Sequence, residues 1–152
     1  MVMMTCWMWI FGDVEGYRWV LDRSRMAFAE AQASRVTGMA TGDKAILYTS
    51  RGAFGNPMRD TSRLVGIVEL SGAVKRGKPV KLADRTFNLF ARFEKIRILP
   101  ERKGPGIAAL IGRLECVKNA RCWGQSFRRS PIKLTTKDFR ILEEAVQDWA
   151  EY

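Results

Sequence analysis

The segment that decides the fold reads Met39-Ala40-Thr41-Gly42-Asp43-Lys44-Ala45-Ile46-Leu47-Tyr48-Thr49-Ser50. Its first half ends in the turn-forming residues Thr41, Gly42 and Asp43, and its second half is a mostly apolar run typical of a strand. The segment therefore predicts a turn that leads into a strand over 44–50. A loop is expected next, over 51–62, because these residues include two glycines, one proline and one asparagine. A loop at the end of a strand can reach a ligand.

Further strands are predicted on both sides of this segment. Residues 6–11, Cys-Trp-Met-Trp-Ile-Phe, are apolar throughout, as in a strand buried on both faces. The patterns after the loop predict strands at 64–70, 80–82 and 87–99, with Gly66 marking a bend in the first of them. The run Lys103-Gly104-Pro105-Gly106 breaks the sheet.

Short helices complete the pattern. Asp13 can cap a helix that contains Tyr17 and Val20, and residues 23–35, which are basic and rich in alanine, are expected to be part irregular and part helical. A short apolar helix is predicted over 107–114. Near the end, Thr135 and Asp138 resemble a capping box before a helix whose apolar residues recur every three or four positions: Phe139, Leu142, Val146 and Trp149. These elements predict one α+β domain over 1–152, built on a small mixed barrel.

The charge of the chain favours a polyanionic partner. Its 26 basic and 16 acidic residues give a formal net charge of +10. The excess is concentrated between residues 17 and 134, which contain 24 basic and 9 acidic residues. Nucleic acid is therefore the first candidate partner and an anionic membrane the second. Many basic proteins carry such charge only for solubility, which is the alternative interpretation.

The cysteines and the N-terminus indicate a cytoplasmic protein that does not enter a membrane. Cys6, Cys116 and Cys122 lack CxxC spacing, and the chain has no histidine to complete a zinc site. Unpatterned cysteines fit a reducing cytoplasm. The apolar start, 1–11, has no basic region or cleavage site and is shorter than the about 20 residues that span a bilayer.

Most catalytic machinery is excluded, and no metal or cofactor is predicted. The absence of histidine removes Ser-His-Asp and Cys-His chemistry. Ser130-Pro131-Ile132-Lys133 matches an SxxK string, but its companion motifs are missing. The glycines at 104, 106 and 112 do not have phosphate-loop spacing. Glutamates such as Glu69 leave a Lys- or Glu-dependent hydrolase as an alternative.

The remaining function is binding, through aromatic side chains next to basic or amide residues. Bases are held by stacking on aromatic faces while polar groups recognise their edges. Three segments have this composition: 24–28, 48–54 and 121–129. Tyr48 and Trp123 each have a core position as the alternative interpretation.

Several segments in succession resemble EVE domains, which are members of the PUA-like superfamily. Residues 39–50 resemble the M-x-x-G-D-x-x-x-x-Y strand entry of that family, and 65–70 are similar to its next strand, v-G-i-a-e-V. Residues 114–119, Trp123-Gly124 and 135–141 resemble its closing signature. The resemblance implies a PUA-like barrel of about five or six strands with flanking short helices and a C-terminal helix. It also implies a pocket for a modified base, with modified cytosine in DNA the leading candidate; the related YTH domains read methylated adenine in RNA.

The resemblance also implies site residues. Tyr48, Ser50 and Trp123 match motif positions, and residues 32–35 partly match a Q-A-R-N stretch of the family pocket. Many members have W-x-G-V-R-N where this chain has Arg25-Met26-Ala27-Phe28, so either Phe28 replaces the missing stacking face or the ligand differs. Together with the aromatic–basic segments, this gives the candidate ligand-binding set: Arg25, Phe28, Arg35, Tyr48, Ser50, Arg51, Phe54, Trp123 and Gln125.

Three functions follow from the sequence. The leading hypothesis is a non-enzymatic reader of a modified base, whose basic surface holds the phosphate backbone. The alternatives are a general RNA-binding module and a small hydrolase of nucleoside amides, similar to some ASCH relatives of the PUA-like group.

Overall fold

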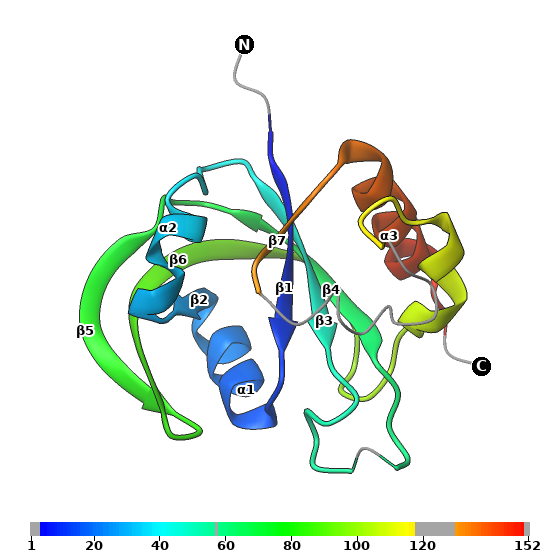
Figure 1. The fold of residues 1–152 in the computed structure, drawn as a ribbon, viewed down its shortest axis with the longest axis horizontal. Helices are drawn as coiled ribbons and strands as arrows, with labels where there is room; N and C mark the ends of the chain where they lie inside the picture. The colour runs from blue at the N-terminus through cyan, green and yellow to red at the C-terminus, as the bar shows by residue number, and fades with distance from the viewer. Residues whose placement is uncertain (1–3, 57, 118–129, 151–152) are drawn as a thin grey trace.

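The computed structural model describes residues 4–56, 58–117 and 130–150. Within them, seven strands form one sheet in the order β2-β6-β4-β3-β1-β7, and β5 pairs with β6 outside this path (Figure 1). In chain order the elements are β1 (Cys6–Phe11), α1 (Val14–Arg23), β2 (Arg25–Phe28), η1 (Glu30–Gln32), α2 (Ala33–Val36), β3 (Lys44–Thr49), β4 (Arg63–Leu70), β5 (Lys75–Leu82), β6 (Arg85–Ile98), η2 (Ile107–Arg113), β7 (Ile132–Leu134) and α3 (Thr136–Asp148).

The sheet is mixed because β1 and β3 are parallel neighbours. Their register runs from Cys6 opposite Lys44 to Phe11 opposite Thr49, whereas the other paired strands are antiparallel. A parallel pair needs a long crossover connection. Here the crossover consists of α1, β2, η1 and α2, and it carries the chain to the far edge of the sheet and back.

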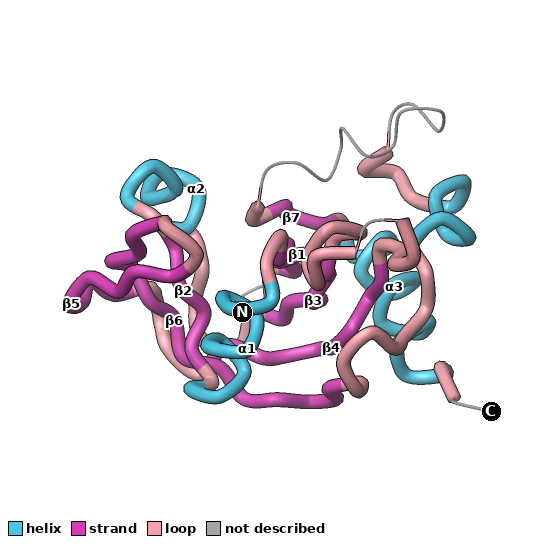
Figure 2. The backbone as a smooth tube through the Cα atoms, turned by 90° about the horizontal axis from the view of Figure 1, so that it is seen from below, coloured by secondary structure: helices cyan, strands magenta, loops and turns pink. Residues whose placement is uncertain are grey.

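Alternating side chains of the central strands are buried on two opposite faces. On one face, Trp7 and Trp9 of β1 join Leu47 of β3 and the residues of α1, β2 and α2; this is the α1-side core. On the other face, Met8 and Tyr48 pack with η2 and α3; this is the α3-side core. Figure 2 shows α1 between the two arms of the curved sheet and α3 against its other side. The prediction that residues 6–11 are buried on both faces is confirmed.

Both predicted caps form. The Asp13 carboxylate accepts a hydrogen bond from Gly16 N at 2.6 Å, and Thr135 Oγ1 accepts one from Asp138 N at 3.1 Å. The Asp138 carboxylate in turn accepts from the backbone amides of Glu115 and Cys116, each at 2.8 Å. The start of α3 is therefore tied to the segment that follows η2.

The basic stretch 23–35 differs from its prediction. It contains the strand β2, which pairs with β6, before the short helical turns η1 and α2. A four-residue edge strand has little periodic signal of its own, and its pairing with β6 decides its conformation. The predicted strand at 80–82 is also longer, because β5 begins at Lys75. No helix in the described ranges is long and apolar enough to cross a membrane.

Candidate functional site

A pocket of about 70 Å³ lies where the end of β1, the start of α1, the end of β2 and the β5–β6 hairpin meet. This volume is far below the roughly 300–1,000 Å³ of pockets that enclose a drug-sized ligand. The pocket can therefore receive one small planar group of a larger molecule. Its described lining residues are Ile10, Phe11, Gly12, Asp13, Gly16, Val20, Met26, Ala27, Gln32, Leu82, Arg85, Phe87 and Ser130.

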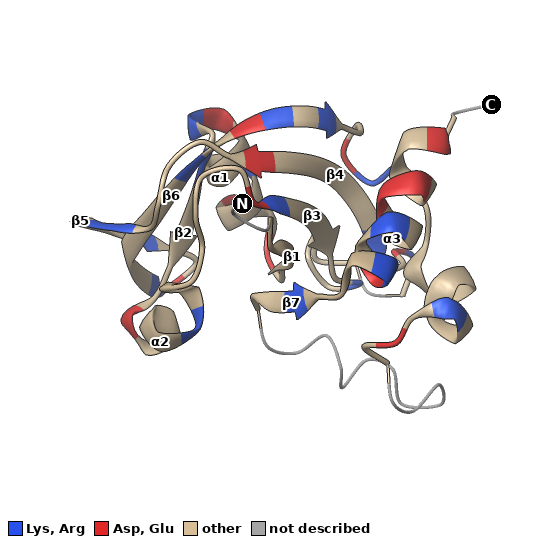
Figure 3. Ribbon diagram, turned by 90° about the horizontal axis from the view of Figure 1, so that it is seen from above, with Lys and Arg blue, Asp and Glu red and all other residues tan. Residues whose placement is uncertain are grey.

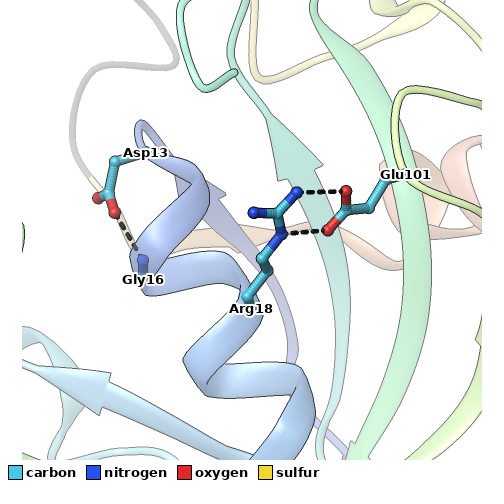
Figure 4. Close-up of polar contacts among 4 residues, drawn as sticks. All are labelled: Asp13, Gly16, Arg18 and Glu101. Carbon is cyan, nitrogen blue, oxygen red and sulfur yellow. Dashed lines mark hydrogen bonds and ion pairs between the residues drawn. The ribbon is translucent and has the colours of Figure 1, made fainter. Parts of the chain in front are cut away.

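Asp13 places a carboxylate at this pocket. Its backbone is extended, with φ −149° and ψ 148°, and one carboxylate oxygen caps α1 at Gly16 N (Figure 4). A Cβ at position 16 would lie 3.1 Å from that oxygen, so glycine gives the carboxylate its room. No described residue donates to the second oxygen, and Asp13 is only partly buried. That oxygen is free to accept a hydrogen bond from a ligand.

One turn further along α1, the helix is bonded to the segment after β6. Arg18 donates to both carboxylate oxygens of Glu101, at 2.7 and 2.9 Å (Figure 4). The bond and the guanidinium charge hold the pKa of Glu101 below its usual range. Because both side chains are well exposed, this pair mainly orients the helix.

Gln32 and Ser130 close the opposite wall. Gln32 Oε1 accepts from Ala29 N at 2.8 Å, and its Nε2 donates to Ser130 O at 2.6 Å. Ser130 Oγ accepts from Ile10 N at 3.0 Å. These bonds join the end of β2, the end of β1 and the start of β7. No described residue accepts the Ser130 hydroxyl proton, so this proton can be donated to a ligand.

The β5–β6 hairpin contributes a cation and an aromatic ring. The Arg85 guanidinium lies over the Phe87 ring, 5.3 Å from its centroid. Arg85 is exposed and makes no ion pair within the described ranges. Phe11, Val20, Met26 and Leu82 give the pocket apolar walls. The site thus combines a hydrogen-bond acceptor, donors and apolar surface, as expected of a pocket that orients a flat polar ring.

The predicted residues Tyr48 and Phe28 do not meet. Tyr48 is 3% exposed in the α3-side core, where burial raises the pKa of its hydroxyl. Phe28 is 0% exposed in the α1-side core, where its ring lies edge-on to Trp9 at 6.1 Å between centroids. They face opposite sides of the sheet, so the structure does not place them in one cavity. Tyr48 adopts the core position that the sequence offered as its alternative, and Phe28, which the resemblance offered as a replacement stacking face, is also a core residue.

The predicted loop residues lie beside the pocket or away from it. Ser50 adjoins it through its backbone, because Ser50 N donates to Phe11 O at 3.0 Å. Arg51 is exposed, and Phe54 packs partly against the α1-side core below the Arg102 guanidinium. Arg102 is itself paired with Asp60 at 2.7 Å, which ties this loop to the segment after β6.

The remaining predicted residues are basic or lie outside the described ranges. Arg25 of β2 lies against the rings of Trp19 and Phe90, at 5.5 and 4.9 Å, and lines a surface groove. Arg35 is exposed on α2. Trp123 and Gln125 fall in 118–129, outside the described residues.

Sequence reasoning missed the polar residues of the pocket as a group. Asp13 was identified only as a helix cap, Ser130 only as part of a rejected SxxK string, and Gln32 only within a partial family motif. Arg85 and Phe87 could not be assigned to the pocket from the sequence. Nothing in the sequence shows which hairpin lies beside the end of β1. A cap residue directly after a buried strand is the one feature that could have marked the site.

The described cysteines are protected thiols. Burial and the neighbouring Asp138 carboxylate raise the pKa of Cys116 to about 12, and burial also raises the pKa of Cys6. Cys122 lies outside the described residues, and no metal-binding cluster occurs among the residues described.

We therefore expect Cys6 and Cys116 to resist alkylation in the folded protein at pH 8, because the thiolate is the reactive form. Iodoacetamide labelling followed by peptide mass spectrometry would check this. Both residues should be labelled rapidly in urea and slowly without it. Labelling of Cys116 in the native protein at the rate of the unfolded chain would contradict the prediction.

No family model matches the chain, and no curated protein matches it. Solved structures do. The YTH domain of Zygosaccharomyces rouxii MRB1, in complex with N6-methyladenosine RNA, matches with a TM-score of 0.65 and 9% identity over 98% of this chain and 90% of that one. Human THYN1, in complex with DNA containing 5-methylcytosine, matches with a TM-score of 0.58 and 11% identity over 97% of this chain and 99% of that one. Rpa0253 from Rhodopseudomonas palustris matches with a TM-score of 0.58 and 14% identity over 97% of both chains.

At these identities the likeness concerns the fold. The curved mixed sheet, the helices of its crossover and the C-terminal helix are the parts that the sequence resemblance implied. The chain therefore has the PUA-like fold of the THYN1-type and YTH domains that are its structural neighbours, and the predicted fold class is confirmed.

Proposed function

We propose that this protein binds a nucleic-acid strand and holds one modified, amine-bearing base in the pocket, without changing it chemically. The observation that carries the proposal is the free carboxylate oxygen of Asp13 at a pocket of about 70 Å³ that has both polar and apolar walls. A carboxylate accepts from the exocyclic amine of cytosine or adenine. The Ser130 hydroxyl and Arg85 can donate to ring nitrogens or carbonyl oxygens of the same base.

The structural neighbours support this assignment. One was solved with 5-methylcytosine in DNA and another with N6-methyladenosine in RNA, and both bases present an amine proton at the edge of the ring. Their methyl groups would contact apolar walls such as Phe11 and Phe87. Modified cytosine in DNA remains the leading ligand.

Binding is favoured over hydrolysis by the lining itself. Among the described lining residues the titratable side chains are Asp13 and Arg85, and neither a lysine nor a glutamate is present. The Lys- or Glu-dependent hydrolysis of nucleoside amides would need one of these at the reacting atom.

The proposal is tested with 12-nucleotide probes that differ in one base. Fluorescence anisotropy would compare DNA with cytosine or 5-methylcytosine, and RNA with adenosine or N6-methyladenosine. One modified probe should bind about fourfold more tightly than its partner, since a buried methyl group contributes about 0.8 kcal/mol. Equal affinity within every pair would overturn the proposal. An affinity that is the same for every base but falls steeply with salt would instead indicate the general RNA-binding module.

Asp13→Asn should weaken binding of the preferred probe by about 10- to 100-fold, because it removes a charged acceptor that contributes about 1.5–3 kcal/mol. Asparagine is as good an N-cap as aspartate, so the helix should keep its stability. Asp22→Asn, on the exposed side of the same helix, is the matched control and should bind as the unsubstituted protein does. If both variants bind alike, Asp13 is not a ligand contact.

A further inference from the structure

A second surface feature is a basic groove beside the pocket. Two adjoining hollows of about 490 and 360 Å³ share Arg25 and Arg92, and the first also contains Arg23 and the second Lys75 and Arg76. These five cations define the basic groove. Figure 3 shows lysines and arginines recurring along β5 and β6, the strands that carry three of them.

Four of the five cations form no ion pair with an acidic residue in the part of the chain that the structure describes. Arg76 is paired with Glu30, which also accepts from Asn88. Within the described ranges no carboxylate forms an ion pair with Arg23, Arg25, Lys75 or Arg92. Like charges gathered without counterions raise the local potential, and a polyanion binds there by releasing its own counterions.

The aromatic rings below the groove are covered by these cations. Arg23 lies over the Trp19 ring at 4.9 Å, and Arg25 lies against both Trp19 and Phe90. A ring face that holds a guanidinium is not free to stack on a base. The rings instead hold the two arginines in place, which reduces the entropy they lose on binding an anion. The groove is therefore suited to phosphates rather than to bases.

The groove and the pocket adjoin along two strands. On β2, Ala27 lines the pocket and Arg25 lines the groove. On β6, Phe87 lines the pocket and Arg92 lines the groove. The paired positions are two residues apart on β2, about 7 Å, and five residues apart on β6, about 17 Å. A strand whose base enters the pocket therefore passes within reach of the groove cations.

We propose that the basic groove binds consecutive phosphates of the same nucleic-acid strand whose base enters the pocket. This inference rests on the proposed function. It predicts that a free modified nucleoside, which has no phosphate, fills the pocket without contacting the groove, whereas a 12-nucleotide strand contacts both.

The test compares R25Q/R92Q with R113Q/R140Q, a control that removes the same charge from exposed positions on η2 and α3. Glutamine keeps part of the packing stem, and circular dichroism would verify folding. With a 12-nucleotide strand, the groove variant should lower the slope of log K against log salt by about 1.4–1.8, as for two lost phosphate contacts. The control should keep the slope, and both variants should bind the free modified nucleoside equally.

The outcomes separate the two proposals. If R25Q/R92Q keeps the salt slope while D13N loses base discrimination, the groove inference is wrong and the pocket stands. If the slope falls but the unsubstituted protein shows no preference for any modified base, the groove is supported as a phosphate site and the base-reading function is wrong. Equal slopes in R25Q/R92Q and R113Q/R140Q would also overturn the groove.

Discussion

Replacement of Asp43 by alanine is expected to lower the free energy of unfolding by about 4 kcal/mol, a large part of the total stability of a domain of this size. Asp43 is 4% exposed. Its carboxylate accepts three hydrogen bonds: from Thr5 N at 3.0 Å, from Trp7 Nε1 at 3.1 Å and from Ala40 N at 3.0 Å. Alanine would leave the buried Trp7 Nε1 and the partly buried amides of Thr5 and Ala40 without this acceptor.

Urea unfolding followed by tryptophan fluorescence would measure the effect. Asp43→Asn keeps the acceptor for Trp7 and Ala40 but loses the one for Thr5, so it should cost about half as much. Asp148→Ala, at an exposed carboxylate near the end of α3, should change stability by less than about 0.5 kcal/mol. A loss below about 1 kcal/mol for Asp43→Ala would show that the three bonds do not hold β1 to the turn before β3.

The second large effect is expected at Phe28. Its replacement by alanine should lower the free energy of unfolding by about 3–5 kcal/mol. The side chain is fully buried against Trp9, so its removal leaves a cavity in the α1-side core. Thermal unfolding should show a clearly lower melting temperature.

A second variant separates the core position of Phe28 from a ligand contact. Phe28→Leu keeps most of the apolar volume and should cost less than the alanine variant. If Phe28 acts only in the core, Phe28→Leu should bind the preferred oligonucleotide with unchanged affinity. A tenfold loss of affinity in this stable variant would indicate that Phe28 contacts the ligand.

The elements with a strong period or a cap could be predicted from the sequence. The strand after Asp43, the buried strand over 6–11 and the capped C-terminal helix lie within a residue or two of their expected bounds. Their signals are local: turn residues, apolar runs and cap spacing. β2 and β7 were not predicted, because strands of four and three residues depend on partners far along the chain.

The site was harder to predict for a geometric reason. Tyr48 follows Leu47 in a strand buried on both faces, so composition does not say which of the two faces meets a ligand. The polar wall of the pocket is assembled from residues in four separate segments. In the sequence, each of these residues can be interpreted from its own segment without a ligand. Only the curvature of the sheet brings Asp13, Gln32, Arg85 and Ser130 together.

The bonds of Ser130 have a consequence for the order of folding. Ser130 meets Ile10 across 120 residues and Gln32 across 98, and β7 pairs with β1 from nearly the opposite end of the chain. Contacts between such distant residues close slowly. During synthesis, the strands from β2 to β6 can pair before Ser130 leaves the ribosome, whereas the pocket wall cannot. A nascent chain would thus acquire its basic hairpin first and the wall of its pocket last.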